Sequence, residues 1–474
     1  MDNKYKRLVK NTLWILVGNT GSKVLAFLLL PFYTRWLGTE GYGLSDLIGT
    51  YSSMLIGLIT LCTADGIFVF TKNRSSDEQR EYYSSALVFT FALFLIWIAV
   101  MAGASFVCQQ LDIRNSFIDN IWFVMGVVLS TFLQNYTQQF VISLEKMKVY
   151  SLTGIILCLT TFVLSFLLIP RYGVYGYIMS LVLSNVFTAA YSFIFSKSWR
   201  YLRFRSFRFN RAKELLAYSI PLIPNSIMWW LVQALNRPIM ESELGYSAIG
   251  IYAVANKFPG IVTMIFSLFA ISWNISVFEE YKKPGFETFY TKIFRAIFFV
   301  ITCGTIVLCL CSQLMVTLFA APEFMEAWKY MVILMIGAMI ACLSSFWGTM
   351  FAVVKQSKYF FYSSVWGAVV SIVANFLLIP TMGLYGACFS VVISYMAMAL
   401  SRYMYSRKFI VAKLLKVSVS YVGTLFFVGA VIIVADNALL KVLASLAGIV
   451  AMLLSERESC KVLIEKVRNR YGKN

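Results

Sequence analysis

The chain has 474 residues, of which 59% are hydrophobic and only 13% are charged, with a mean hydropathy of +0.75. Soluble domains carry about 25% charged residues, so this composition excludes an ordinary soluble protein. The chain contains no histidine, which excludes histidine-based acid–base catalysis, imidazole metal sites and histidine pH switches. The net charge of +19 is compatible with nucleic-acid binding, but its distribution along the chain argues against that partner.

Apolar runs of about 20 residues, the length needed to cross a bilayer, follow one another along the chain between polar breaks. We therefore predict an all-α integral membrane protein with about 14 transmembrane helices. The expected spans are 11–34, 44–70, 83–106, 118–143, 150–170, 174–196, 215–240, 247–275, 291–319, 329–354, 359–379, 385–405, 414–434 and 438–455.

The basic residues gather in alternate breaks between these spans. If the N-terminus is placed in the cytoplasm, 33 of the 41 lysines and arginines fall in cytoplasmic segments and 6 in outer segments. The positive-inside rule then predicts that both termini are cytoplasmic. It also accounts for the positive charge without any nucleic-acid partner.

Two proline- and glycine-containing motifs each occur twice. Residues 166–176 read FLLIPRYGVYG, and residues 376–386 read FLLIPTMGLYG. Similarly, Pro31 precedes Leu37-Gly38, and Pro238 precedes Leu244-Gly245. Each motif alone is a turn, but the nearly equal spacing of the two pairs indicates a duplicated bundle. Repeated halves are a known plan for transporters, so we expect a site between the halves.

The duplication predicts a six-helix lobe at 1–196 and a second at 215–409, with accessory helices 13 and 14 at 410–455. A basic linker at 197–214 joins the lobes, and a charged cytoplasmic tail follows at 456–474. The linker alternates arginine with aromatic residues, a pattern that can stack on RNA bases. We favour the alternative, in which its cations meet anionic lipid and its aromatic side chains lie at the membrane interface.

Signatures of enzymes and of metal sites are missing from the sequence. The nine cysteines form no C-x-x-C pair, and Gly18–Lys23 lacks the spacing of a phosphate-binding loop. We therefore predict a protein that is not an enzyme, with no catalytic residues, no cofactor and no metal.

Ionisable residues at membrane depth are costly and serve as the first candidates for a functional site. Lys23 lies in the middle of the first span, and Asn19 shares its helical face. Lys257 precedes Pro259-Gly260, which favours a local helix break. Both lysines are expected to line a cavity for an anionic substrate, although Lys23 could instead pair with an aspartate.

Further candidates accompany these two lysines. Asp65 could take up a proton or Na⁺, or could only neutralise Lys23, and Asp46 lies near the outer end of the second span. Arg35 and Arg237 lie near the outer ends of spans 1 and 7. Span 7 also carries a predicted polar and aromatic stripe for sugar contact or helix packing, made of Asn225, Trp229, Gln233 and Asn236.

Several segments together resemble the Wzx-type polysaccharide transporters of the multidrug/oligosaccharidyl-lipid/polysaccharide (MOP) superfamily. The resemblance spans nearly the whole chain and is carried by both copies of the LLIP motif and by three further segments. These are Lys10–Trp14, Phe27–Gly43 and Leu244–Lys257.

The resemblance implies two six-helix lobes around a central cavity, plus two further helices. It implies a flippase of the bacterial inner membrane that moves an undecaprenyl-pyrophosphate-linked oligosaccharide, such as an O-antigen, capsule or exopolysaccharide unit, by alternating access. Lys23 and Lys257 would attract the pyrophosphate, and Asn19, Arg35 and Arg237 are further candidates for substrate binding. Expected partners are this lipid-linked oligosaccharide, membrane lipids, a polysaccharide polymerase and glycosyltransferases.

Three alternatives remain open. A lipid II flippase would carry the same cavity charge. A cation-coupled drug antiporter of the same superfamily should have an acidic cavity, whereas the deep residues here are two lysines and one aspartate. A membrane-bound glycan polymerase would need catalytic carboxylates or a large soluble loop.

Overall fold

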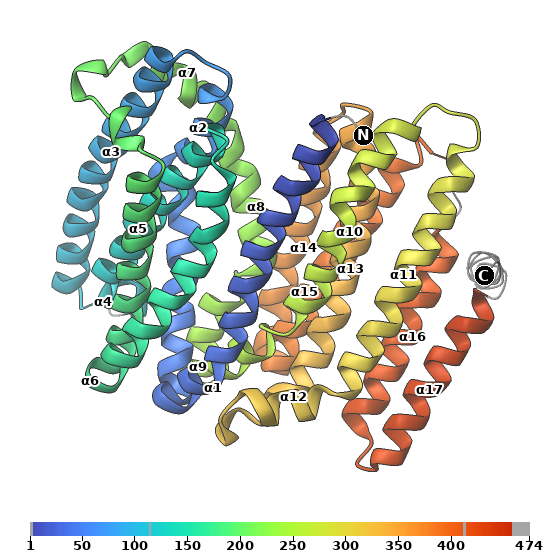
Figure 1. Ribbon diagram of the computed structural model, residues 1–474. Helices are drawn as coiled ribbons and strands as arrows, with labels where there is room; N and C mark the ends of the chain where they lie inside the picture. Colours follow the sequence, from blue (N-terminus) through green and yellow to red (C-terminus); the bar gives the residue numbers. More distant parts are fainter. Residues whose placement is uncertain (1–2, 113–114, 411–413, 457–474) are drawn as a thin grey trace. The chain divides into compact units, whose positions relative to one another are not determined.

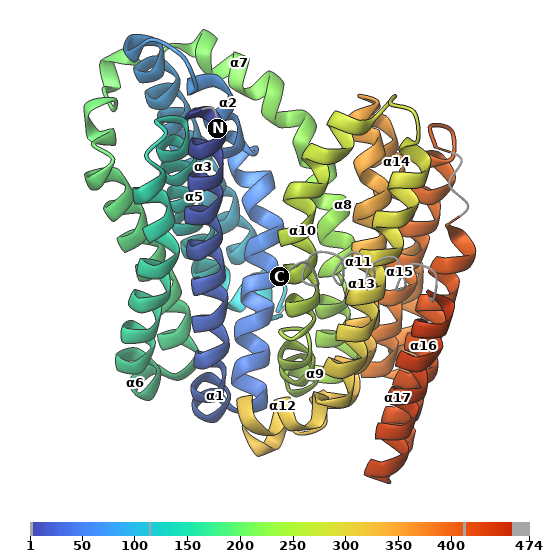
Figure 2. The ribbon, with the colours of Figure 1, turned by 45° about the vertical axis from the view of Figure 1, so that its right-hand side comes forward.

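The computed structural model describes residues 3–112, 115–410 and 414–456, and the side chains of residues 3–26 and of Ser455 lie outside that description. The described residues are almost entirely helical and hold no β-strand. They form two compact units, unit 1 ending at Trp230 and unit 2 beginning at Leu231. Figures 1 and 2 show the helices of each unit running mostly alongside one another.

In chain order, unit 1 contains α1 (Asn3–Thr60), α2 (Thr63–Thr71), α3 (Ser76–Gln110), α4 (Ser116–Asp119), α5 (Ile121–Ser143), α6 (Met147–Phe195), α7 (Phe209–Ser219) and α8 (Ile223–Gln233). The last residues of α8 belong to unit 2. Those of unit 2 are α9 (Asn236–Ala255), α10 (Pro259–Glu280), α11 (Phe286–Leu310), α12 (Ser312–Phe319), α13 (Ala327–Val353), α14 (Lys358–Met382), α15 (Leu384–Ser406), α16 (Leu415–Val434) and α17 (Ala438–Ser455). Short 3₁₀ turns lie at Ser198–Arg200, Phe204–Ser206, Ile220–Leu222 and Pro322–Phe324.

The predicted spans fall mainly in helix among the described residues, with breaks inside spans such as 44–70, 215–240, 247–275 and 291–319, and the prediction of an all-α membrane fold is confirmed. Eight helical segments are long and apolar enough to cross a membrane. A ninth results if Phe27–Thr60 and Thr63–Thr71, which meet at 54°, are counted as one bent span. Fewer spans are counted than were predicted because some of these segments contain two predicted spans joined by a sharp turn, and because α5 and α17 are not among the counted segments.

The duplicated sequence motifs are also duplicated in backbone conformation. Gly38 in α1 and Gly245 in α9 have φ values of 62° and 77° and ψ values of −176° and −179°. Residues that carry a Cβ atom rarely adopt these backbone conformations. In Figure 1 the two limbs of α1 meet at the bottom of the view, where the chain reverses. Gly38 is therefore the turn between the first two predicted spans.

The LLIP motifs build a second type of turn with one close backbone contact. A Cβ atom added to Gly176 would lie 2.3 Å from the Leu168 carbonyl oxygen, and one added to Gly386 would lie 1.9 Å from that of Leu378. Only glycine permits this approach of the two limbs. The recurrence of the same contact, eight residues back in each unit, explains why both glycines stand at the same place in the motif.

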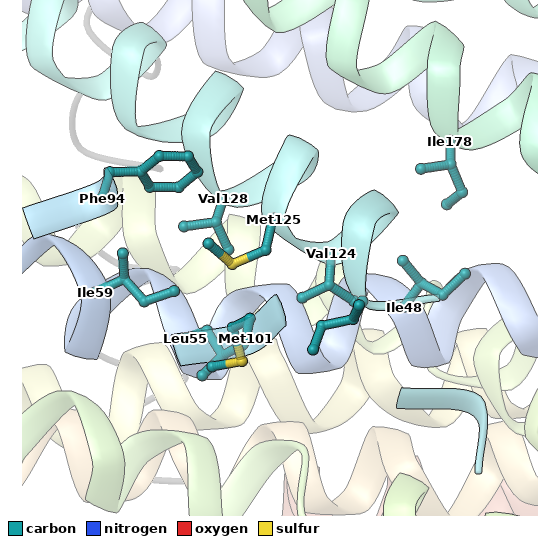
Figure 3. Close-up of a cluster of buried hydrophobic side chains, with 10 residues drawn as sticks. Ile48, Leu55, Ile59, Phe94, Met101, Val124, Met125, Val128 and Ile178 are labelled. Carbon is teal, nitrogen blue, oxygen red and sulfur yellow. The ribbon is translucent and has the colours of Figure 1, made fainter. Parts of the chain in front are cut away.

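An apolar cluster holds the helices of unit 1 together. Ile48, Leu55 and Ile59 of α1 lie against Val124, Met125 and Val128 of α5, as Figure 3 shows. The buried set also includes Phe94 and Met101 of α3, Ile121 of α5 and Ile178 of α6. Burying a large aliphatic or aromatic side chain is worth about 1.5–3 kcal/mol relative to water. In a membrane, close packing takes a larger share of the stabilisation.

Aromatic packing dominates the core of unit 2. Trp273 of α10 stacks on Phe346 of α13 with ring centroids 4.6 Å apart, and Tyr290 of α11 meets the same ring at 4.9 Å. Along α13, most side chains are buried. This central helix therefore gives unit 2 a rigid frame for the helices that pack on it.

The basic linker lies on unit 1 in the structure. The backbone N–H of Arg203 donates to Ser84 Oγ at 3.0 Å, and that of Arg208 donates to Ser85 Oγ at 2.9 Å. Arg211 adds an ion pair with Glu81 at 3.0 Å. Unit 1 extends to Trp230, past the predicted end of the linker, so the linker and α7 belong structurally with the first set of helices.

Candidate functional site

Lys257 lies in a helix break of unit 2. Helix α9 ends at Ala255 and α10 begins at Pro259, as the Pro-Gly pair predicts. The turn is closed by the Lys257 N–H donating to the Val254 carbonyl at 3.1 Å and by the Gly260 N–H donating to the Lys257 carbonyl at 3.3 Å. The Lys257 side chain is exposed and forms no ion pair within the described part of the chain. Its ammonium group is therefore available to an anion.

Arg237 has a different environment from Lys257, because its side chain is only 7% exposed. Its Nη1 donates to the Gln233 carbonyl at 2.9 Å and to Asn236 Oδ1 at 3.3 Å. Its guanidinium also lies 5.1 Å from the ring centroid of Tyr252. These contacts occupy Arg237 within unit 2, so its surroundings are those of a residue that packs helix α9.

The predicted polar stripe does not lie on one continuous helix. Helix α8 ends at Gln233, two turn residues follow, and α9 begins at Asn236. Asn225 and Gln233 are exposed and Trp229 is half-buried, whereas Asn236 is 1% exposed. The break turns Asn236 into the interior, where its amide faces Arg237. The expectation of four residues along a single face is therefore wrong for Asn236.

The first part of α8 packs on the second limb of α1 within unit 1. The indole N–H of Trp230 donates to the Thr50 carbonyl at 3.1 Å. Ser226 Oγ lies 3.0 Å from the position of a Cβ added to Gly57. Asn225 and Trp229 thus belong to a segment that runs antiparallel to the second limb of α1, from Gly57 back toward Thr50.

The region around Asp65 begins with a second helix break. Helix α1 ends at Thr60, and Leu61 and Cys62 have φ values of 49° and 53°, which are strained for residues with side chains. Helix α2 starts at Thr63, whose hydroxyl lies 2.8 Å from that of Thr90. Asp65 is exposed in the first turn of α2.

Asp46 and Arg35 lie on either side of the Gly38 reversal in α1. Asp46 is half-buried one turn after the fully buried Tyr42, and Arg35 is exposed. Lys23 and Asn19 belong to the first limb of α1, but their side chains lie outside the described residues. The predicted cavity-lining role of Lys23 and its alternative pairing with an aspartate both stay predictions.

A buried guanidinium in α15 was missed by the sequence reasoning. Arg402 is 3% exposed, and it donates from Nε to Ser363 Oγ at 3.1 Å and from Nη1 to the Ser344 carbonyl at 3.3 Å. It also lies 5.3 Å from the Phe360 ring centroid. Its position inside the predicted membrane span 385–405 is the sequence feature that indicates a buried cation. Its contacts tie α15 to α13 and α14.

Metal chemistry has no site in the described residues, because no group of three or more histidine, cysteine, aspartate or glutamate side chains comes together there. The eight described cysteines are free. A helical chain with repeated glycine turns, two interrupted membrane helices and a lysine at one interruption has the architecture of a multi-span membrane transporter.

Residues 8–273 match the model of the family described as polysaccharide biosynthesis protein. The match covers more than half of the chain, so the chain belongs to this family. It is also 25% identical over 272 residues to protein 1 of the Lsg locus of Haemophilus influenzae, covering 54% of this chain. That alignment spans 63% of the Haemophilus protein.

Solved structures share the fold. The lipid II flippase MurJ in its inward closed conformation superposes with a TM-score of 0.67 at 15% identity, covering 94% of this chain and 99% of that chain. An inward-facing multidrug resistance MATE transporter of the MOP superfamily gives 0.61 at 14% identity, covering 79% and 94%. A MOP superfamily transporter from Pyrococcus furiosus gives 0.56 at 15% identity, covering 87% and 96%.

The family match confirms the predicted family, and the superpositions confirm the predicted all-α membrane fold. Flippases and multidrug transporters share this fold, so the fold alone does not identify a substrate.

Proposed function

We propose that this protein is a flippase that moves an undecaprenyl-pyrophosphate-linked oligosaccharide across the bacterial inner membrane by alternating access. The observation that carries the proposal is the match of residues 8–273 to the polysaccharide biosynthesis family. The excess of basic residues on one side of the predicted topology supports an orientation with both termini in the cytoplasm.

In this proposal the pyrophosphate is attracted by lysine ammonium groups. Lys257 supports this role because its side chain is exposed at a helix break. Lys23 is the corresponding candidate in unit 1. The exposed Asn225 and Gln233 and the half-buried Trp229 are candidates for sugar contacts, because amides and indole rings bind hydroxyl-rich surfaces. The proposed partners are glycosyltransferases, which act before transport, and a polysaccharide polymerase, which acts after it.

Asp65 remains the candidate for ion coupling, with Asp46 as the second. Asp65 is exposed and Asp46 is half-buried. Without an ion-binding carboxylate, the gradient of the lipid-linked substrate itself drives transport. An ion-coupled antiporter would require that one of these carboxylates binds and releases the ion in each cycle.

Two alternative functions follow from the shared fold. The similarity to MurJ favours lipid II as a second candidate substrate, and the similarity to MATE transporters favours a drug antiporter. Lys257 at the helix break counts against a cationic drug, because like charges repel in a low-dielectric site.

The decisive experiment is a lipid analysis of a strain that lacks this gene. We expect undecaprenyl-linked oligosaccharide to build up on the cytoplasmic leaflet while surface polymer disappears, and both changes to reverse when the intact gene returns. A build-up of lipid II with loss of viability would identify the cell-wall precursor instead. Unchanged lipid-linked sugars with altered drug tolerance would replace the proposal by the antiporter function.

A further inference from the structure

The basic linker (residues 197–214) is held in a fixed place on unit 1. In addition to the bonds from the backbone of Arg203 and Arg208 to α3, Ser84 Oγ donates to the Tyr201 carbonyl at 3.2 Å. The Tyr201 ring packs edge-on against Phe140 of α5 at 5.2 Å. Arg211 donates to Glu81 and, at 3.0 Å, to the Tyr82 hydroxyl. The linker therefore presents its outer side chains as an ordered surface.

That outer surface combines cations with large aromatic rings. The segment holds seven lysines and arginines against one acidic residue, Glu214. Three aromatic side chains point away from the unit: Phe204 is 75% exposed, Phe209 63% and Trp199 53%. The exposed cations that accompany them are Lys197, Arg200, Arg203, Arg205, Arg208 and Lys213.

The positive charge is most concentrated where the linker begins. Lys146, between α5 and α6, donates from Nζ to the Ser196 carbonyl, which fixes it beside Lys197. Burial lowers the pKa of Lys146, and the charges of Lys197 and Arg200 lower it further. Arg200 itself lies 5.1 Å from the ring centroid of Trp199. Lys146, Lys197 and Arg200 thus lie close enough for their charges to interact, which favours an anionic ligand.

The position of these three cations relative to the membrane helices indicates which anionic ligand they bind. Ile194 and Phe195, the last residues of the apolar helix α6, are 58% and 63% exposed. Exposed apolar side chains at the end of a spanning helix contact lipid chains, and residues just beyond them lie at the level of the headgroups. Lys197 and Trp199 follow at once. Tyr218, at the end of α7, is also exposed.

We propose that the basic linker is a docking surface for the headgroups of anionic phospholipids, with Lys146, Lys197 and Arg200 forming its main phosphate-binding point and Trp199, Phe204 and Phe209 inserting into the interface. The surface lies on the side of the membrane that the positive-inside rule assigns to the cytoplasm. It anchors unit 1, and the start of α8, to that leaflet. This inference does not depend on which substrate the protein carries.

The test is native mass spectrometry of the full-length protein in detergent with phosphatidylglycerol and phosphatidylcholine as probes. We expect the unmodified protein to retain phosphatidylglycerol in preference. Each basic residue near an anionic lipid contributes a factor of about five in affinity. The triple variant K146Q/K197Q/R200Q should therefore lose affinity for phosphatidylglycerol by a factor on the order of one hundred.

The matched control is R171Q/K329Q/K441Q, which removes the same charge from three exposed or half-buried residues of the predicted outer segments. It should retain the lipid preference. Equal losses in both triple variants, or no loss in the linker variant, would overturn the proposal. Phe204→Ala, which keeps every charge, should lower retention several-fold and provides a second measurement if the triple variant fails to fold.

Two further arms test other anionic ligands with the same unmodified protein. Displacement of the lipid by millimolar inorganic phosphate alone would show a simple phosphate site and overturn lipid docking. Binding of a short single-stranded RNA that competes with phosphatidylglycerol would replace the lipid by nucleic acid. We expect neither competitor to displace the lipid, because neither offers the acyl chains that the exposed aromatic rings contact.

Discussion

Gly173 and Gly383 hold the same backbone conformation, with φ 54° and ψ −129° in the first and φ 58° and ψ −132° in the second. Each stands at the reversal of a helical hairpin, and a glycine three residues later closes the hairpin by backbone contact. The duplicated sequence therefore encodes a duplicated turn geometry, because in both copies the limbs approach too closely for any side chain.

Gly386→Ala tests this geometry. The new Cβ atom would lie 1.9 Å from the Leu378 carbonyl oxygen, so the two limbs must separate. We expect a loss of roughly 1–3 kcal/mol or more of stability, as for other overpacked sites. Thermal unfolding of the purified protein in detergent measures the effect. Gly423→Ala is the control, because no atom lies within 4 Å of its added Cβ. A Gly386→Ala protein as stable as this control would contradict the contact.

Lys257→Ala and Lys23→Ala test the proposed pyrophosphate attraction. We expect each to reduce surface polymer by at least about tenfold, because loss of one charge-assisted bond in a low-dielectric site costs about 1.5–3 kcal/mol. Lys257→Arg should keep most of the activity. The measurement compares surface polymer with the amount of protein in the membrane. Lys292→Ala, an exposed lysine of α11, serves as the control. Normal polymer in both alanine variants would remove these residues from the proposed site.

Arg237→Ala should act on stability rather than on transport. The variant loses the bonds to the Gln233 carbonyl and to Asn236, together with the contact to Tyr252. We expect about 2–4 kcal/mol of destabilisation, seen as a lower unfolding temperature and less protein in the membrane. Activity per folded molecule should change little. If the protein remains stable but transport is lost, Arg237 contacts the substrate as the sequence first indicated.

Glu81→Gln should loosen the basic linker. Glu81 pairs with Arg211 at 3.0 Å and with Arg208 at 3.9 Å, and both arginines belong to the linker. We expect cleavage by trypsin after Arg205 or Arg208 to become several-fold faster, because weaker pairing raises the population of the locally opened linker. Asp77→Asn is the matched control on the same helix, since Asp77 pairs only with Arg80 among the described residues. Equal cleavage rates in the two variants would show that the backbone bonds alone hold the linker.

Much of the architecture could be predicted from the sequence, since it depends on local chemistry. Apolar runs longer than a bilayer core must be helical, because unpaired backbone groups are too costly in lipid. The position of Pro259 predicts the break beside Lys257, because proline lacks the N–H that would continue helix α9. The paired LLIP motifs predict the duplication. These features, together with the family motifs, were sufficient to indicate the class of protein.

The environments of individual charged residues were decided by the tertiary structure. Arg237 and Lys257 look alike in sequence, as single cations in apolar spans, yet one is buried and the other exposed. Tyr252, the ring beside Arg237, comes from beyond the Gly245 reversal, so hydropathy along the chain could not reveal the pairing. Hydropathy indicates that a segment lies in the membrane. Whether a given side chain in that segment is buried or exposed depends on the helices that pack against it, and these come from distant parts of the chain.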